Sequence, residues 1–91
     1  HMDVHYILGV HIADRTANAI DVQKTLTQYG CNIRTRVGLH HVDDKVCSSD
    51  GLILLELFGD RQACDDLADK LSRLGGIEVQ RMIFEHPRGR S

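Results

Sequence analysis

Hydrophobic and polar positions divide the chain into six segments with two different periods. Four segments either alternate or are strongly apolar, and they are rich in residues that favour β-strands. They cover residues 5–13, 32–40, 52–58 and 77–85. The run LILLELF at 52–58 is the most apolar of the four and predicts an inner strand, whereas polar residues 42–51 predict a loop.

Apolar residues recur every three or four positions in the two remaining segments, which predicts amphipathic helices. The first stripe lies within 16–29 and the second follows Asp60; their members are Ala19, Val22, Leu26 and Tyr29, then Cys64, Leu67, Ala68, Leu71 and Leu74. Asp14 and Asp60 stand at the expected N-caps. Gly30 and the pair Gly75–Gly76 stand at the expected helix ends.

The resulting order, β-α-β-β-α-β, predicts a ferredoxin-like α+β sandwich. Four antiparallel strands in the order 4-1-3-2 should carry both helices on one face. A chain of 91 residues is one domain. We place it at 3–86, with a cloning remnant and initiator at 1–2 and a C-terminal tail at 87–91.

Composition narrows the classes of function. The formal charge of −2 argues against a nucleic-acid binder, and no apolar run reaches the roughly 18 residues that span a membrane. We expect a cytoplasmic protein whose three cysteines are reduced thiols. No Ser-His-acid order, phosphate loop or paired-carboxylate motif stands in the sequence, so we expect no enzyme.

Strand periodicity predicts which residues point away from the helices. Strict alternation places His11 and Glu56 on this open face of the sheet, together with Arg34, Arg36, Gly38 and His40 of the second strand. The second strand should lie at the edge of the sheet, and an unpaired edge invites pairing with a second copy. We therefore expect a homodimer or tetramer that forms through this strand.

Three stretches, YILGVHIADR at 6–15, RVGL at 36–39 and LADKLSRLGGIEVQ at 67–80, resemble a known family. It is the family of small stand-alone ACT-like proteins identified as regulators of iron-only hydrogenase systems. They are similar in turn to the C-terminal sensing domain of the nickel-responsive repressor. The resemblance extends from about residue 6 to residue 84 and implies an ACT-like fold with a regulatory role.

The resemblance also implies a candidate metal site. In the repressor, a His-x-His pair on the second strand is followed six residues later by a cysteine. His41 and Cys47 keep that spacing here, but Leu39 stands where the first histidine would be. Imidazole and thiolate ligands suit nickel or zinc. The alternative, that this stretch is a strand end and a solvated loop, is favoured.

The turn after the first strand is a second candidate. Amino-acid-binding ACT domains carry an aspartate, a proline and a glycine there; this chain keeps Asp14 and Arg15 but has Thr16 and Ala17 at the next two positions.

Two hypotheses on the function of the chain follow from the sequence. One is a stand-alone sensor domain that oligomerises and binds a small ligand or a transition metal. The other is a ligand-free structural module for oligomerisation or interaction.

Overall fold

The computed structural model describes residues 4–39 and 51–85. The helices and strands come in the predicted order: β1 Val4–Ile12, α1 Arg15–Gln28, a short 3₁₀ helix η1 Gly30–Asn32, β2 Ile33–Leu39, β3 Gly51–Leu57, α2 Arg61–Ser72 and β4 Ile77–Glu85. The boundaries of β4 coincide with the predicted ones, and the others lie within two residues of them.

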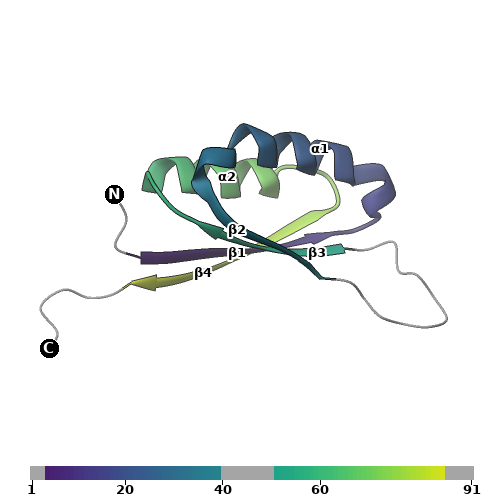
Figure 1. The fold of residues 1–91 in the computed structure, drawn as a ribbon. Helices are drawn as coiled ribbons and strands as arrows, with labels where there is room; N and C mark the ends of the chain where they lie inside the picture. Colours follow the sequence, from purple (N-terminus) through teal and green to yellow (C-terminus); the bar gives the residue numbers. More distant parts are fainter. Residues whose placement is uncertain (1–3, 40–50, 86–91) are drawn as a thin grey trace, which may run out of the picture.

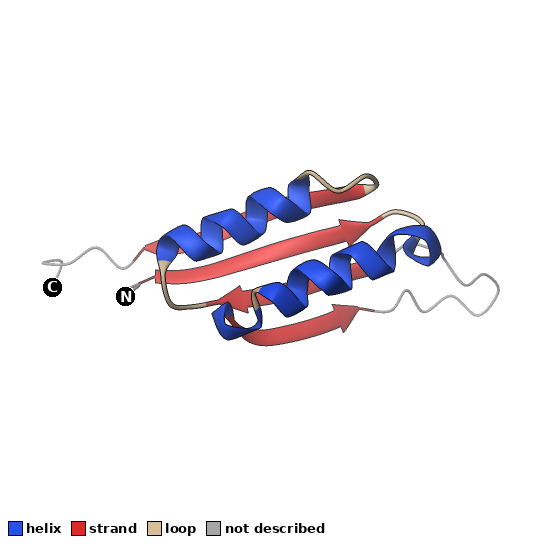
Figure 2. Ribbon diagram, turned by 90° about the horizontal axis from the view of Figure 1, so that it is seen from above, coloured by secondary structure: helices blue, strands red, loops and turns tan. Residues whose placement is uncertain are grey.

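The four strands form one antiparallel sheet in the order β2-β3-β1-β4, which confirms the predicted order 4-1-3-2 read from the other edge. Both helices cover the same face of the sheet, and no helix of residues 4–39 and 51–85 lies on the opposite face (Figure 1). Figure 2, a view from above, shows the two helices lying side by side over the sheet, roughly along the direction of the strands. The ferredoxin-like, ACT-like fold is therefore confirmed.

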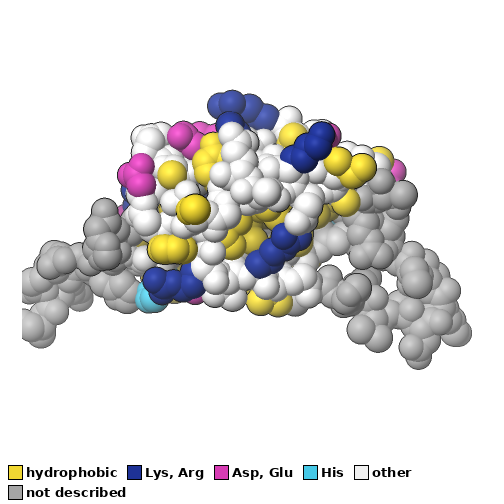
Figure 3. Space-filling view, turned by 45° about the horizontal axis from the view of Figure 1, so that its top comes forward, with side chains coloured by type: hydrophobic (Ala, Val, Ile, Leu, Met, Phe, Trp, Pro, Cys, Tyr) yellow, Lys and Arg dark blue, Asp and Glu magenta, His cyan; other side chains and the backbone are white. Residues whose placement is uncertain are grey.

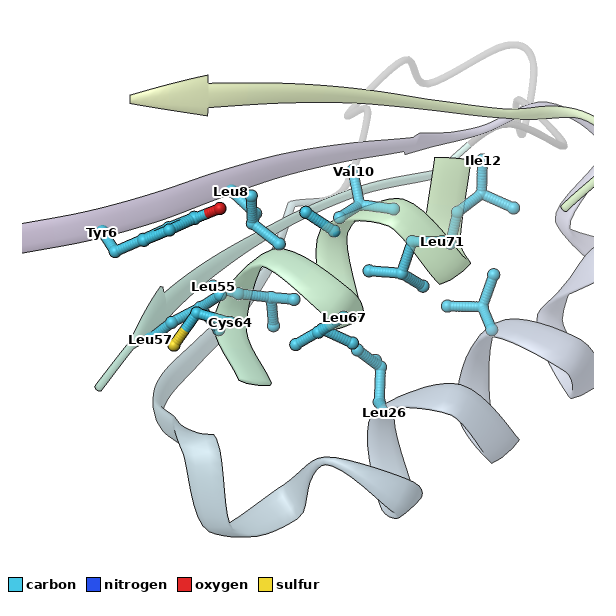
Figure 4. Packing of buried hydrophobic residues seen from close by; sticks show 12 residues of the cluster. Tyr6, Leu8, Val10, Ile12, Leu26, Leu55, Leu57, Cys64, Leu67 and Leu71 are labelled. Atoms are coloured by element: carbon cyan, nitrogen blue, oxygen red, sulfur yellow. The ribbon is translucent and has the colours of Figure 1, made fainter. Parts of the chain in front are cut away.

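The core lies between the sheet and the helices. Alternate residues of β1 and β3 point into it, as predicted, and meet the apolar stripe of α2 (Figure 4). The buried residues are Tyr6, Leu8, Val10, Ile12, Leu55 and Leu57 of the sheet, Val22 and Leu26 of α1, and Cys64, Leu67, Ala68 and Leu71 of α2. Ala19, predicted to lie on the buried stripe of α1, is exposed. Helix α1 thus contributes fewer side chains to the core than α2.

The two helices begin differently. Asp60 caps α2 as predicted, because its Oδ1 accepts a hydrogen bond of 3.4 Å from the backbone N–H of Gln62. Asp14 precedes α1 but makes no side-chain cap hydrogen bond to it and has a left-handed backbone, with φ 49°. The prediction that Gly30 ends α1 in a left-handed conformation is also wrong, since Gly30 instead begins η1.

Gly76 joins the start of α1 to the turn before β4. Its carbonyl accepts a hydrogen bond of 2.8 Å from the backbone N–H of Ala13, and its φ is 75°. Asn18 closes the same corner, because its Nδ2 donates to the Ala13 carbonyl at 2.5 Å. A Cβ at position 76 would stand 2.6 Å from that Nδ2, and the positive φ also disfavours a side chain, so any other residue would strain this corner.

Candidate functional site

Strand β2 lies at one edge of the sheet, as predicted. It pairs with β3 on one side, and no strand within residues 4–39 and 51–85 pairs with its other side. An exposed edge presents a row of backbone donors and acceptors that can pair with another strand. The edge is therefore the first candidate for a functional surface.

A β-bulge near the start of β2 changes which side chains lie on each face. Ile33 pairs with Leu57 and Thr35 pairs with Glu56. Between these two pairs, β2 moves forward by two residues while β3 moves by one. Arg34 is the additional residue, and its guanidinium carbon lies 5.2 Å from the centre of the Phe58 ring. Beyond the bulge, Thr35, Arg36 and Val37 each lie on the face opposite to the one that strict alternation predicts.

The prediction that Arg36 and Gly38 lie on the open face is therefore wrong. Arg36 pairs with Leu55, a core residue, and its Nη2 donates a hydrogen bond of 2.8 Å to Oε1 of Gln23 in α1. Gly38 pairs with Ile53 on the same side. Thr35 and Val37 take the open-face positions instead, opposite Glu56 and Leu54. A bulge leaves no clear mark in a single sequence, so periodicity could not have revealed the change.

Helix α1 carries an open depression next to this edge. It has a volume of about 360 Å³ and is lined by Ile20, Gln23, Lys24 and Thr27. Ile20 is 68% exposed, and Gln23 is the residue that Arg36 holds from β2. Figure 3 shows Lys and Arg side chains spread over the side of the molecule that includes the helices. The depression is therefore mainly apolar, with Lys24 in its lining and Arg36 hydrogen-bonded to Gln23 of its wall.

Glu56 links three strands on the open face. Its Oε2 lies 3.4 Å from Nδ1 of His5 in β1, and its Oε1 accepts a hydrogen bond of 3.4 Å from the Thr35 hydroxyl of β2. His11 lies on the same face, half-buried, opposite Leu52 and Glu78. The predicted open-face positions of His11 and Glu56 are therefore confirmed.

The turn before α1 is held by backbone and amide contacts. The Asp14 carbonyl accepts hydrogen bonds from the backbone N–H groups of Ala17 and Asn18, at 3.0 and 3.2 Å. The Asn18 amide also reaches this carbonyl, at 3.3 Å. Arg15 begins α1, and the structure does not describe its side chain. Asp14 and Arg15 therefore stay predicted ligand residues without a test.

The candidate metal ligands His41 and Cys47 lie outside the described residues, as does His40. Within the described ranges, no group of three or more His, Cys, Asp or Glu side chains could hold a metal ion. Cys31 is exposed and Cys64 is buried, and both are free thiols. Burial, with Asp65 and Asp60 nearby, raises the pKa of the Cys64 thiol. This agrees with the predicted role of Cys64 as a core residue.

Sequence reasoning missed a polar contact under α2. The Tyr6 hydroxyl donates a hydrogen bond of 2.6 Å to Oδ1 of Asp65, and the Arg61 guanidinium carbon lies 5.3 Å from the centre of the Tyr6 ring. Burial, and then the hydrogen bond to Asp65, raise the pKa of Tyr6 to about 12. Tyr6 is fully buried, so the contact fixes α2 on the sheet.

No family model matches the chain, and no curated protein is similar to it. Among solved structures, it is similar to the uncharacterized protein TM1266 from Thermotoga maritima, with 26% sequence identity and a TM-score of 0.74. That similarity covers 87% of this chain and 94% of that chain.

Two further solved structures share the fold at low identity. A formyltetrahydrofolate deformylase from Pseudomonas putida KT2440 is 17% identical, with a TM-score of 0.54. The match covers 97% of this chain but 30% of the deformylase. CPII, a nitrogen regulatory PII-like protein from Thiomonas intermedia K12, is 10% identical with a TM-score of 0.55, over 92% of this chain and 96% of CPII. These similarities show the fold.

Neither helix of the described chain has the length and apolar character that crossing a membrane requires.

Proposed function

We propose that this chain is a regulatory module that pairs with a second copy along β2 and binds a small anionic ligand beside that edge. The observation that carries the proposal is the bulged edge strand. The bulge turns Arg36 toward α1, where it reaches Gln23 in the wall of the depression. A basic group, an apolar floor and a free strand edge thus stand next to one another.

Pairing along β2 follows from the backbone. The strand offers seven residues, Ile33–Leu39, whose outer donors and acceptors have no partner strand in the described chain. Antiparallel pairing of two copies would join the two sheets into one of eight strands. It would also bring the two α1 depressions toward a common two-fold axis. A small domain with a modest core gains stability from such burial.

The nature of the ligand follows from charge and shape. Lys24 lines the depression and Arg36 contacts its wall, so an anionic group would find charge-assisted hydrogen bonds there. Ile20 offers an apolar contact to the remainder of a small molecule. CPII, which shares this fold, was solved bound to ADP, AMP and bicarbonate, all of which are anions.

Binding can be tested by isothermal titration with ADP, AMP, bicarbonate and the free amino acids. We expect one of these probes to bind, and Arg36→Gln to weaken it at least about tenfold, the loss of one charge-assisted contact. Arg73→Gln is the matched control, because Arg73 is exposed at the far end of α2 and the change removes the same charge. Equal effects of the two variants, or no binding by any probe, would overturn the proposed ligand site.

Assembly is tested separately by analytical ultracentrifugation of the untagged protein. We expect a dimer or a larger even oligomer at a protein concentration of roughly tens of micromolar. A monomer at that concentration would remove the proposed edge pairing.

The apolar open face favours a second candidate, a ligand-free module for assembly alone. Among the side chains that the structure describes, the exposed hydrophobic ones on this face are Val37, Leu52, Leu54, Met82 and Phe84. An oligomer that binds none of the probes, and whose assembly Arg36→Gln leaves unchanged, would support this alternative.

A further inference from the structure

Strand β4 is the second edge of the sheet. It pairs with β1, and no strand within residues 4–39 and 51–85 pairs with its outer side. Its register with β1 is unbroken over nine residues, from Ile77 opposite Ile12 to Glu85 opposite Val4. The strand therefore offers a regular row of outward backbone donors and acceptors, longer than the seven residues of β2.

The usual protections of an edge strand are largely absent from β4. The strand contains no Pro, no Lys and no bulge. A charged side chain turned toward the helix layer is another protection, and Arg81 takes such a position opposite Leu8. Its charge is compensated, however, because Nη2 of Arg81 lies 2.8 Å from Oδ1 of Asp69 in α2. An added strand would therefore not bury an unpaired cation.

The side of β4 that faces away from the helices is apolar toward the end of the strand. Met82 is 55% exposed and Phe84 50%, which makes them the most exposed large apolar side chains of the described strands. Gln80 and Glu78 complete this side, so Glu78 is its one charged group. In a strand added next to β4, the residues on this side would lie beside Met82 and Phe84, and apolar residues suit that position.

The opposite side of β4 is bordered by charged residues of α2. Arg61, Asp65 and Asp69 follow one another at intervals of four along the helix, and Asp69 contacts Arg81 of β4. Arg61 is shared between two carboxylates, because its Nε lies 3.6 Å from Oδ1 of Asp65 and its Nη1 lies 3.9 Å from Oε1 of Glu85. Three carboxylates thus stand against two guanidinium groups, and each of the five is more than one third exposed. This acidic border favours Lys or Arg on the same side of an added strand.

A second copy of the chain does not fit this edge. In antiparallel pairing of two β4 strands over their full length, Arg81 would lie opposite Arg81 of the copy, and like charges directly opposite one another destabilise paired strands. Pairing at both edges would also give no closed assembly. The two-fold axes of β2 pairing and β4 pairing would both be perpendicular to the sheet, so that copies would add without end. The argument from closure rests on the proposed β2 pairing, whereas the argument from charge does not.

We propose that β4 receives an extended segment of another protein, in which apolar residues alternate with Lys or Arg. The segment adds to the sheet as a further strand, with its backbone bonded to the outer side of β4. Its apolar residues pack beside Met82 and Phe84, and its cations lie beside the acidic border on α2. Docking at β4 leaves β2 and the α1 depression free, so each copy of the proposed dimer can carry such a partner.

The test uses two short synthetic peptides, one in which lysine and valine alternate and one in which glutamate and valine alternate. Amide NMR spectra of the isotope-labelled chain locate the binding and give the affinity of each peptide. Glu85→Lys reverses an exposed carboxylate of the acidic border and leaves the sheet core untouched. Asp21→Lys is the matched control, because it reverses an exposed carboxylate on α1. Circular dichroism checks that both variants fold.

We expect the lysine peptide to shift the amide resonances of β4 with a dissociation constant below about 1 mM, and the glutamate peptide to bind more weakly. Glu85→Lys should weaken binding of the lysine peptide at least about threefold and strengthen that of the glutamate peptide, whereas Asp21→Lys should change neither.

Three results would overturn the docking edge. They are the absence of shifts at β4, shifts confined to β2, and equal affinities of the two peptides in every variant. Changes at the β4 amides on dilution without peptide would show that a second copy occupies the edge, which would also overturn it. Failure of the β2 pairing is seen separately, as a monomer in sedimentation, and does not alter the result with the peptides.

Discussion

Arg36 of β2 donates a hydrogen bond of 2.8 Å to Gln23 of α1, and this contact places the Arg36 side chain on the helix side of the sheet. Its neighbour Thr35 takes the other side, where its hydroxyl contacts Glu56 at 3.4 Å. The edge strand thus presents a basic group to the helix layer and leaves the open face without it. The proposed ligand site depends on this division.

The division can be tested by double-mutant cycles. Arg36→Ala and Gln23→Ala should show a coupling energy of about 0.5 kcal/mol in urea unfolding, a value typical of an exposed polar contact. Arg36→Ala and Glu56→Ala should show none, because the two side chains lie on opposite faces. Coupling of Arg36 to Glu56 but not to Gln23 would place Arg36 on the open face and show that the side chains of β2 alternate strictly.

Replacing Gly76 by alanine should destabilise the protein by about 1–3 kcal/mol. The cause is the positive φ of Gly76 and the short distance from a new Cβ to the Asn18 amide and the Ala13 carbonyl. Gly75→Ala is the matched control, since nothing lies within 4 Å of its Cβ position. Similar free energies of unfolding for the two variants would contradict this account of the corner.

Tyr6→Phe should lower the free energy of unfolding by about 1–2 kcal/mol, the net value of a hydrogen bond to a charged group that water can partly reach. Tyr29→Phe is the control, because the Tyr29 ring, which lies next to Lys70, is only half-buried. A loss as large in the Tyr29 variant would show that the Tyr6–Asp65 contact has no particular importance.

Alkaline pH should weaken the fold through the same residue. The pKa of Tyr6 is raised to about 12 in the folded chain from an ordinary 10.0, so the folded state keeps a proton that the unfolded state loses. The stabilisation is fully present below pH 10 and is lost as pH rises toward 12. Over that window, the wild-type chain should lose about 2 kcal/mol more than Tyr6→Phe. Parallel pH profiles for the two proteins would be evidence against the raised pKa.

The sequence stretch from His40 to Cys47 makes a separate prediction. Protein purified without nickel resin should show no saturable binding of nickel or zinc near neutral pH, because Leu39 stands where the repressor-like pattern needs a ligand. Saturable binding of one ion per chain would support the metal hypothesis instead. In that case, Cys47→Ser should weaken it by orders of magnitude, and Asp43→Asn should change it little.

Periodicity was sufficient to predict the strands, the helices, the sheet order and the faces of β1 and β3. The strands and helices each place one face against a core of aliphatic side chains, and this produces the periodic pattern in the sequence. It failed at β2, where the additional residue Arg34 breaks the alternation. It also failed at Asp14, since a suitable cap residue does not dictate the backbone conformation of the turn. The Tyr6–Asp65 contact joins residues 59 positions apart, and no local pattern announces such a pair.

Amide hydrogen exchange along β2, followed by NMR, tests the central claim of edge pairing most directly. In an isolated sheet, alternate amides of an edge strand point to solvent and exchange fast, while those bonded to β3 are protected. We predict continuous protection from Arg34 to Leu39 at concentrations where the oligomer dominates, with the outward-pointing amides losing protection on dilution. Fast exchange of the outward-pointing amides at every concentration would contradict pairing of two copies through this strand.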